Sequence, residues 1–320
     1  MGVHVETSLP LAETSVRSDM AIALLKKVSP AFDQTIIGGD PYFLKKLIEE
    51  GDEKGINWEK LQVSLITAQD WLPESLRTYL ASRIGINPDN SGIRGIYATM
   101  GMTELGLNVF HESKYTIGIR RAILKDMELR NLLFQSDMRA APCIFHYYPF
   151  RTYIESIKNK EQDELIFTVT DLKNILPIIR YNTGDAGKIM SYNQLKTVLT
   201  PKYPIFIPDL KLPIGILYGR IKNQIIFRNQ FLHIEDIKEG LFSDSEVASK
   251  VTGLIKIQSN KDKIYVMVHL KNGILNDTNL KKKIRNAIHT YLPFEVEIQL
   301  ISYNEFPDAI ELNYERKMGS

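Results

Sequence analysis

Three short polar stretches of the sequence carry residue types that could act on a nucleotide. They are ATMGMTELG (98–106), RYNTGDAGK (180–188) and YGRIKNQIIFRNQFLHIEDI (218–237). In the first, Thr103 and Glu104 follow a glycine-containing turn, and a hydroxyl beside a carboxylate can contact a phosphate oxygen and a magnesium ion together. The same pair also suits a helix N-terminus, with Thr as the cap and Glu in the first turn.

The second and third stretches offer contacts to a ribose. Asp185 stands between two glycines, which free the backbone to turn sharply. Its carboxylate can accept hydrogen bonds from vicinal hydroxyls, as acidic residues do in dinucleotide sites, or it can simply form an Asx turn. Arg220, with Lys222 close behind, presents forked donors for a ribose or phosphate, although a surface strand residue is the alternative.

Other kinds of catalytic chemistry have no pattern to support them. The six histidines are scattered without metal-ligand spacing, and the single cysteine, Cys143, has apolar neighbours typical of an inert buried thiol. The sequence contains no GxSxG elbow, no GxxxxGK[ST] loop and no GxGxxG turn. A zinc enzyme, a serine hydrolase and a P-loop enzyme are therefore not indicated.

The composition is that of a globular protein of one large or two ordinary domains, with 320 residues, 44% of them hydrophobic and 24% charged. The net charge of +2 implies neither nucleic acid nor an anionic membrane as a partner. No secretory signal and no membrane-spanning apolar run is present. We expect a cytoplasmic protein.

Alternating strand-like and helix-like patterns in the first part of the chain predict an α/β fold with a mainly parallel sheet. Helices are predicted over 41–50, with Gly51 as the stop, and over 73–84, ending at Gly85. The predicted strands of this part are 61–67 and 93–98.

From residue 165 the pattern becomes richer in strands, which are predicted at 165–170, 177–181 and 215–228. Four prolines between residues 195 and 215 indicate a loop-rich crossing consistent with a domain boundary. After residue 253 the order strand–strand–helix–strand predicts a small α+β domain.

Together, GMTE (101–104), RYNTGD (180–185) and GRIKNQIIFRNQ (219–230) resemble three signature motifs of the adenylate-forming superfamily of acyl- and aryl-CoA ligases. LPIIRYNTGD (176–185) is most similar to the phenylacetate–CoA ligase branch. ITAQDWLPESLRTYLASRIG (66–85) is similar to the stretch that begins with the adenine-loop motif of that family.

The resemblance implies a role for each matching residue. Asp185 and Arg220 would bind the ribose hydroxyls of ATP, Lys222 would be the hinge residue, and Lys317 would bridge the acyl carboxylate and the α-phosphate. The remaining matches would contact the adenine (Ala68, Gln69, Met100 and Gly101), a phosphate (Thr103) and the magnesium ion (Glu104). Met100 stands where the family usually has a stacking tyrosine, and a flexible thioether is a weaker platform.

The reaction implied by the resemblance is AMP-forming acid–thiol ligation. A small-molecule carboxylic acid attacks the α-phosphate of Mg·ATP, and a thiol such as coenzyme A then takes the acyl group. The implied architecture is an incomplete large nucleotide- and acyl-binding domain over residues 1–218, with a mainly parallel sheet and a β-rich part. A small mobile C-terminal domain follows over 219–320, with the hinge at 220–222.

One feature of the family is absent from the sequence. Its Ser/Thr/Gly-rich phosphate loop has no counterpart before residue 30, where Thr7, Ser8, Thr14 and Ser15 occur without a neighbouring glycine. We therefore expect a ligase completed by a protein partner that supplies this loop, a shortened ligase with residual activity, or a non-catalytic nucleotide- or acyl-binding module or scaffold. An exposed sheet edge would also favour a homo-oligomer.

Overall fold

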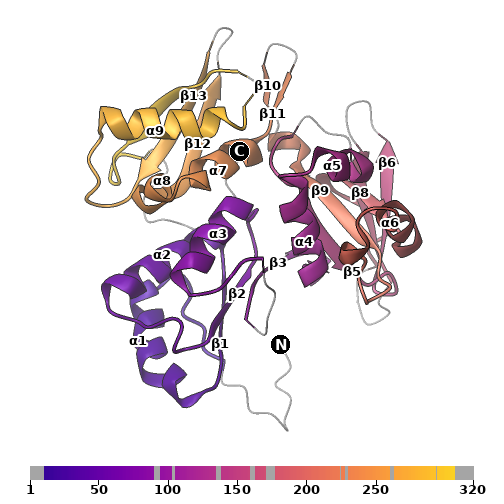
Figure 1. Cartoon of the computed structure of the whole chain (residues 1–320), viewed down its shortest axis with the longest axis horizontal. Coiled ribbons are helices and arrows are strands. Elements are labelled where there is room, and N and C mark those ends of the chain that lie inside the picture. Colours follow the sequence, from indigo (N-terminus) through magenta and orange to yellow (C-terminus); the bar gives the residue numbers. More distant parts are fainter. Residues whose placement is uncertain are drawn as a thin grey trace.

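A computed structural model describes residues 11–89, 94–102, 105–134, 138–158, 163–170, 177–223, 225–227, 230–259, 263–292 and 294–306, without the side chains of 106–108 and 223. Figure 1 shows three regions, namely an N-terminal layer of helices and strands, a β-rich region and a C-terminal α+β unit. The predicted α/β class with a β-rich part and a small α+β unit is confirmed.

The N-terminal layer has a parallel sheet with helices on one side (Figure 1). Its strands and helices are β1 (Thr35–Gly39), β2 (Val63–Thr67), β3 (Ile96–Met102), α1 (Ser18–Val28), α2 (Pro41–Glu53) and α3 (Glu74–Arg83), with the 3₁₀ turn η1 (Ser29–Ala31). Asp40 caps α2 by accepting hydrogen bonds from the backbone N–H groups of Tyr42 and Phe43. Gly85, with φ of +68°, lies just beyond α3 and ends this helical segment as predicted.

The β-rich region continues the same sheet with antiparallel strands. Within the described residues the whole sheet has the order β1-β2-β3-β4-β5-β9-β8-β7-β6. The added elements are β4 (Gly106–His111), β5 (Cys143–Tyr147), β6 (Thr152–Lys158), β7 (Asp163–Val169), β8 (Tyr181–Met190), β9 (Ile214–Arg220), α4 (Lys114–Ile123), α5 (Met127–Leu133), α6 (Tyr192–Leu199) and η2 (Pro204–Phe206). Strand β3 is thus parallel to β2 on one side and antiparallel to β4 on the other.

The C-terminal unit has its own three-stranded sheet in the described part of the chain, in the order β12-β13-β14. A connecting segment with η3 (Ile221–Asn223) and the hairpin β10 (Ile225–Phe227) and β11 (Gln230–Leu232) leads into it. Its elements are α7 (Ile234–Ser243), α8 (Ser245–Lys250), β12 (Val251–Ser259), β13 (Ile264–Leu270), α9 (Thr278–His289) and β14 (Glu297–Ile301).

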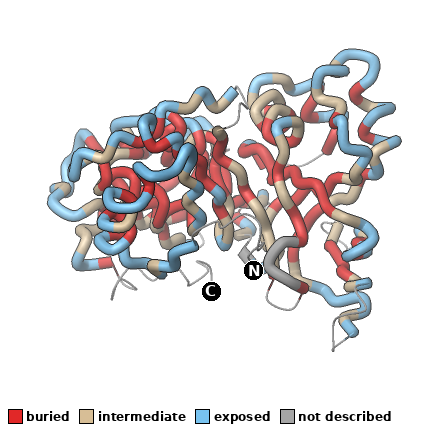
Figure 2. The backbone as a smooth tube through the Cα atoms, turned by 90° about the horizontal axis from the view of Figure 1, so that it is seen from below, coloured by how far each residue is buried: buried red, intermediate tan, exposed pale blue. Residues whose placement is uncertain are grey.

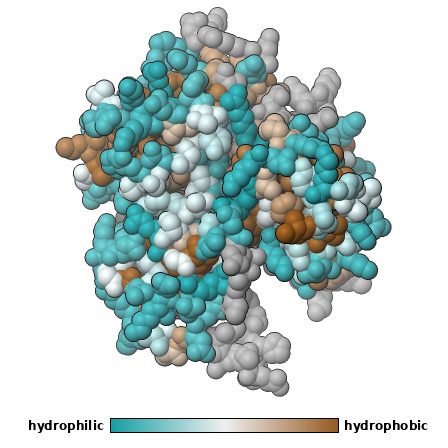
Figure 3. All heavy atoms as spheres, viewed as in Figure 1, coloured by the Kyte–Doolittle hydropathy of each residue, from teal (hydrophilic) through white to brown (hydrophobic). Residues whose placement is uncertain are grey.

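One apolar core joins the N-terminal layer to the C-terminal unit. It includes Leu44 and Leu65 from the first and Leu241 and Val266 from the second, all of them buried. Figure 2 shows buried residues running through the interior of both halves of the molecule, with exposed residues around them. A second core lies in the β-rich region, where α4, α5 and α6 contribute to it. The face drawn in Figure 3 is largely hydrophilic, as expected of a surface in contact with water.

Two boundary predictions are wrong. Helix α2 does not stop at Gly51 but continues to Glu53, and a glycine with φ of +71°, Gly55, follows its end. Gly51 instead makes room for the indole of Trp58. The proline-rich crossing from 195 to 215 does not separate domains, since β8 before it and β9 after it are paired neighbours in one sheet. Prolines there border η2 and the turns that return the chain to the sheet.

A buried ion network connects the two parts of the large sheet. Arg77 of α3 contacts Glu74 at 3.0 Å and Glu112, the residue after β4, at 2.8 Å. Arg120 of α4 contacts the same two carboxylates at 2.9 and 2.8 Å. Glu112 also accepts a hydrogen bond from the backbone N–H of Ala98 in β3 at 2.6 Å. All four side chains are buried, so each charge depends on the others.

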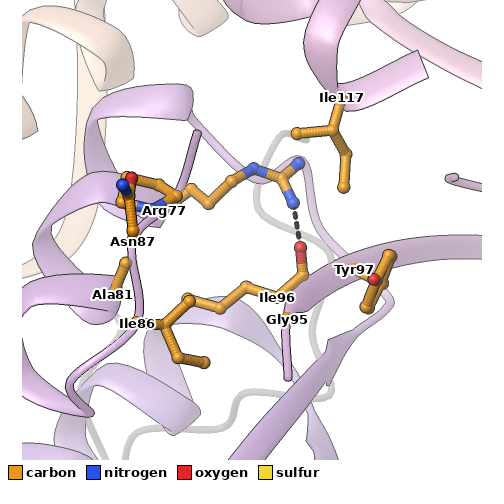
Figure 4. A pocket seen from close by; sticks show the side chains of 9 residues that line it. Arg77, Ala81, Ile86, Asn87, Gly95, Ile96, Tyr97 and Ile117 are labelled. Carbon is orange, nitrogen blue, oxygen red and sulfur yellow. Dashed lines mark hydrogen bonds between the residues drawn. The ribbon is translucent and has the colours of Figure 1, made fainter. Parts of the chain in front are cut away.

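Beside this network lies a cavity of about 20 Å³. Figure 4 shows Arg77 at its wall, donating a hydrogen bond to the carbonyl oxygen of Ile96, with Tyr97 nearby. A volume of this size holds a water molecule and excludes a nucleotide. The cavity is therefore a packing feature of the sheet joint, the place where the parallel part of the sheet meets the antiparallel part.

We expect Gly51→Ala to lower the free energy of unfolding by about 1–3 kcal/mol, because overpacking a buried site strains its surroundings. A Cβ at this position would lie 2.0 Å from the Cζ2 atom of Trp58, which is itself buried. Urea unfolding followed by tryptophan fluorescence measures the effect. Gly38→Ala is the matched control, since the nearest atom there is 3.8 Å away. Equal losses in the two variants would contradict the packing argument.

Candidate functional site

The predicted ribose-binding pair is brought together by strand register. Asp185 in β8 lies directly opposite Arg220 at the end of β9, and Arg220 Nε is 3.8 Å from Asp185 Oδ1. The RYNTGD stretch is not a free loop but the beginning of β8, with Gly184 at φ +75° and an irregular register after Ala186. The strand pairing therefore fixes the positions of both residues.

Burial around this pair leaves little of the carboxylate open. Asp185 is 4% exposed, whereas the side chain of Arg220 is 41% exposed. Within the described residues, the hydroxyl of Thr183 is also buried and has no hydrogen-bond partner. A buried hydroxyl without a partner costs free energy, and a ligand hydroxyl can supply the missing hydrogen bond. Lys222 lies just beyond the pair in η3 and is exposed.

The predicted adenine contacts lie at the carboxyl ends of two neighbouring parallel strands. Ala68 and Gln69 follow β2, and Met100 and Gly101 are near the end of β3. Thr67 pairs with Ala98, so the two segments leave the sheet side by side. The carboxyl edge of parallel strands is where open α/β sheets bind ligands. Strands β4, β5 and β9 lie between this edge and Asp185 in the sheet.

The remaining predicted residues lie outside the part of the chain that the structure describes. They are Thr103, Glu104 and Lys317.

Among the described residues, no group of three or more His, Cys, Asp and Glu side chains is placed to hold a metal ion. None of the helices that the structure describes is long and apolar enough to cross a membrane. Cys143 is buried as predicted, and burial raises the pKa of its thiol to about 12.

Sequence reasoning missed the charged residues of α7, which attach the C-terminal unit to the β-rich region and to the N-terminal layer. Asp236 Oδ1 accepts hydrogen bonds from the backbone N–H groups of Arg139 at 2.9 Å and Ala140 at 2.6 Å. Lys238 forms an ion pair with Asp70 at 2.8 Å. The pattern HIEDIKEGLF contains apolar residues at helical spacing, but nothing in it indicates that its charged residues are buried as well.

Glu239 of α7 caps the N-terminus of α3. Its two carboxylate oxygens accept hydrogen bonds from the backbone N–H groups of Glu74 at 3.0 Å and Ser75 at 2.7 Å. The hydroxyl of Ser75 donates to the backbone carbonyl of Glu239 at 2.8 Å. These contacts satisfy donors that the first turn of a helix leaves unpaired.

A cleft of about 540 Å³ lies beside this cap. Its walls come from α3, α7, the C-terminal end of α4 and the start of α8, and they include Thr78, Ser82, Lys125 and Ser243. The cleft contains none of the residues that the sequence motifs predict to bind the nucleotide.

Several solved structures have a fold similar to that of this chain. A 2-hydroxyisobutyryl-CoA ligase in the postadenylation state with R3-HIB-AMP aligns over 92% of this chain and 56% of its own, with a TM-score of 0.61 and 14% identity. The anthranilate CoA ligase AuaEII, in complex with anthranoyl-AMP, aligns over 92% and 50%, with a TM-score of 0.55 and 10% identity. Coronafacic acid ligase from Pectobacterium brasiliense aligns over 92% and 50%, with a TM-score of 0.51 and 14% identity.

The chain has the fold of the adenylate-forming ligases. It spans about half the length of these ligases. No family model matches the sequence, and no curated protein matches it. The predicted resemblance to the adenylate-forming ligases is thus confirmed at the level of the fold, with sequence identities of 14% and 10%.

The cap at Glu239 makes stability depend on pH. Burial, aided by the charge of Glu74, raises the pKa of Glu239 to about 7 from an ordinary value near 4.3. The folded chain then binds a proton that the unfolded chain releases between these two values. We expect Glu239 alone to lower the free energy of unfolding by about 1–3 kcal/mol from pH 5 to pH 8. Asp40, Glu235 and Asp236, whose pKa burial also raises to about 7, add to this fall.

Urea unfolding across this pH range measures the effect, and Glu239→Gln should reduce the pH dependence. Glu246→Gln is the control. Hydrogen bonds from Lys250 and Lys283 lower the pKa of Glu246 to about 2, so this carboxylate stays charged throughout the range. An unchanged pH dependence in Glu239→Gln would show that the proton is taken up elsewhere.

Proposed function

We propose that this chain is the nucleotide- and acid-binding part of an AMP-forming acid–thiol ligase of the phenylacetate–CoA ligase-like type. The observation that carries the proposal is the pairing of Asp185 with Arg220 within a ligase fold. Both residues were predicted from separate motifs to bind one ribose. The unpaired buried hydroxyl of Thr183, two residues from Asp185, also supports a ligand with hydroxyl groups here.

The proposed reaction has two steps. A carboxylate oxygen of the acid attacks the α-phosphorus of ATP, which forms acyl-AMP and releases pyrophosphate. A thiol, coenzyme A in this proposal, then attacks the acyl carbon and releases AMP. In such displacements, positioning and charge neutralisation contribute more than a general base.

In this proposal each motif residue has one task. Asp185 accepts hydrogen bonds from the ribose hydroxyls, Arg220 binds beside it, and Lys222 acts as the hinge. The other assignments are adenine contact for Ala68, Gln69, Met100 and Gly101, phosphate contact for Thr103, magnesium binding for Glu104 and neutralisation of the reacting carboxylate and phosphate for Lys317.

A protein partner is part of the proposal. Parallel sheets are normally covered on both faces, and α1, α2 and α3 gather on one side of β1–β3 (Figure 1). On the other face Ile36 is 61% exposed and Ile66 is 38% exposed. We propose that this face receives a polypeptide that carries the phosphate loop and the rest of the ligase fold. A second copy of this chain, paired along the edge strand β1, is the alternative partner.

A non-catalytic nucleotide- or acyl-binding module is the second candidate. The observation that favours it is that the chain spans about half of the similar ligases. Such a module would bind ATP or acyl-AMP without exchanging pyrophosphate. The two functions therefore differ in turnover, and they share the ribose site.

We expect Asp185→Asn to weaken ATP binding roughly 10- to 100-fold, because a hydrogen bond to a charged group contributes about 1.5–3 kcal/mol. Isothermal titration of the full chain with Mg·ATP measures the affinity. Carboxylate-dependent exchange between ATP and pyrophosphate, measured on the full chain, tests for turnover.

Asp209→Asn is the matched control, since the side chain of Asp209 is 80% exposed and lies before β9. Binding without exchange would support the non-catalytic module. Equal affinity for ATP in the wild-type chain and Asp185→Asn, or no ATP binding at all, would overturn the assignment of the ribose site.

A further inference from the structure

The loop between β2 and α3 contains a strained backbone turn. Gln69 is exposed and has φ of +76°, a left-handed conformation that costs a non-glycine residue about 1–3 kcal/mol. Ala68 before it donates a backbone hydrogen bond to Gly39 at 3.0 Å, and Asp70 after it donates one to Ala68 at 3.0 Å. A strained turn persists only if its surroundings hold it, so the contacts of Asp70 matter.

The carboxylate of Asp70 is held from two sides. Its Oδ1 accepts a hydrogen bond from the backbone N–H of Trp71 at 2.6 Å, within the same loop. Its Oδ2 accepts one from Nζ of Lys238 at 2.8 Å, which comes from α7 of the C-terminal unit. The lysine side chain is 3% exposed, and its Nζ lies 4.9 Å from the centre of the Tyr42 ring. The turn is therefore fixed by a buried cation from a distant part of the chain.

Lys238 also partly offsets the negative charge of a second carboxylate, that of Asp40. Burial and the nearby charge of Asp70 raise the pKa of Asp40, the cap of α2, to about 7, and the charge of Lys238 acts in the opposite direction. Without the ammonium group, Asp70 would lose its charged partner, and the pKa of Asp40 would rise further. The Asp70 loop, which is more exposed than the helix cap, would then be held less firmly.

We propose that Lys238 is a positioning residue for nucleotide binding, which acts through Asp70 to hold the Gln69 turn in the shape that receives the adenine. This inference rests on the proposed function, because it takes the Ala68–Gln69 segment as an adenine contact. Since Lys238 belongs to α7, nucleotide affinity depends on how α7 is docked. By linkage, the nucleotide stabilises that docking by the same factor.

The test uses the full chain and Lys238→Met, which keeps the length of the side chain and removes its charge. We expect Mg·ATP to bind roughly tenfold more weakly, the size of effect typical of coupling between sites. Hydrogen exchange of the amides in residues 67–72, measured without nucleotide, should become about tenfold faster. Lys238→Arg should restore both quantities in large part.

The matched control is Lys250→Met, the same substitution at a partly exposed lysine that pairs with Glu246 on α8. A second pair of variants separates positioning from a general loss of stability. In Asp70→Asn the lysine has lost the group through which it acts, so adding Lys238→Met should weaken ATP binding much less than in the wild-type chain. The double variant also leaves no unpaired charge at this contact, which keeps the experiment possible if Lys238→Met alone fails to fold.

The outcomes distinguish this inference from the proposed function. If Asp185→Asn weakens ATP binding and Lys238→Met leaves it unchanged, the inference is overturned and the proposed function is not. The inference would also fail if Lys238→Met weakened ATP binding equally in the wild-type chain and in the Asp70→Asn variant. No ATP binding by the wild-type chain would overturn the proposed function, and this inference with it.

Discussion

Two buried arginines, Arg77 and Arg120, neutralise the carboxylates of Glu74 and Glu112 at the place where the parallel part of the sheet meets the antiparallel part. Removing one member of such a network leaves a buried charge without compensation, at a cost of about 3–5 kcal/mol. The network fixes α3 and α4 on one side of the joint and, through Glu112 and Ala98, the strand β3 itself. The ends of β2 and β3, where the adenine contacts are predicted, depend on this joint for their relative position.

The same network extends to the C-terminal unit. Glu74 contributes its side chain to the arginines and its backbone N–H to Glu239, so one residue of α3 connects the sheet joint to α7. Three residues of α7, namely Asp236, Lys238 and Glu239, contact three separate segments of the rest of the chain. Docking through backbone donors and one ion pair is selective for orientation, because each contact depends on direction as well as distance.

Local sequence signals were sufficient for several elements and failed for others. Helix α3 and its end at Gly85 follow from spacing and a glycine. Helix α2 passes through Gly51, since this glycine makes room for Trp58 and does not end the helix. The motifs identified Asp185 and Arg220 separately, but only the register of β8 and β9 sets them opposite each other. Lys238 could not be predicted, since a lysine between acidic residues on a helix is normally solvated.

The pairing of β5 with β9 has a consequence for the route by which the chain folds. Cys143 pairs with Leu217, and β6, β7 and β8 all lie in the sequence between them. Closing so long a loop costs configurational entropy before any contact compensates for it. The local hairpin of β6 and β7 can form early, while the middle of the sheet must wait for its distant strand. Until β9 arrives, β5 presents an open apolar edge, and the nascent chain is most prone to aggregation at that stage.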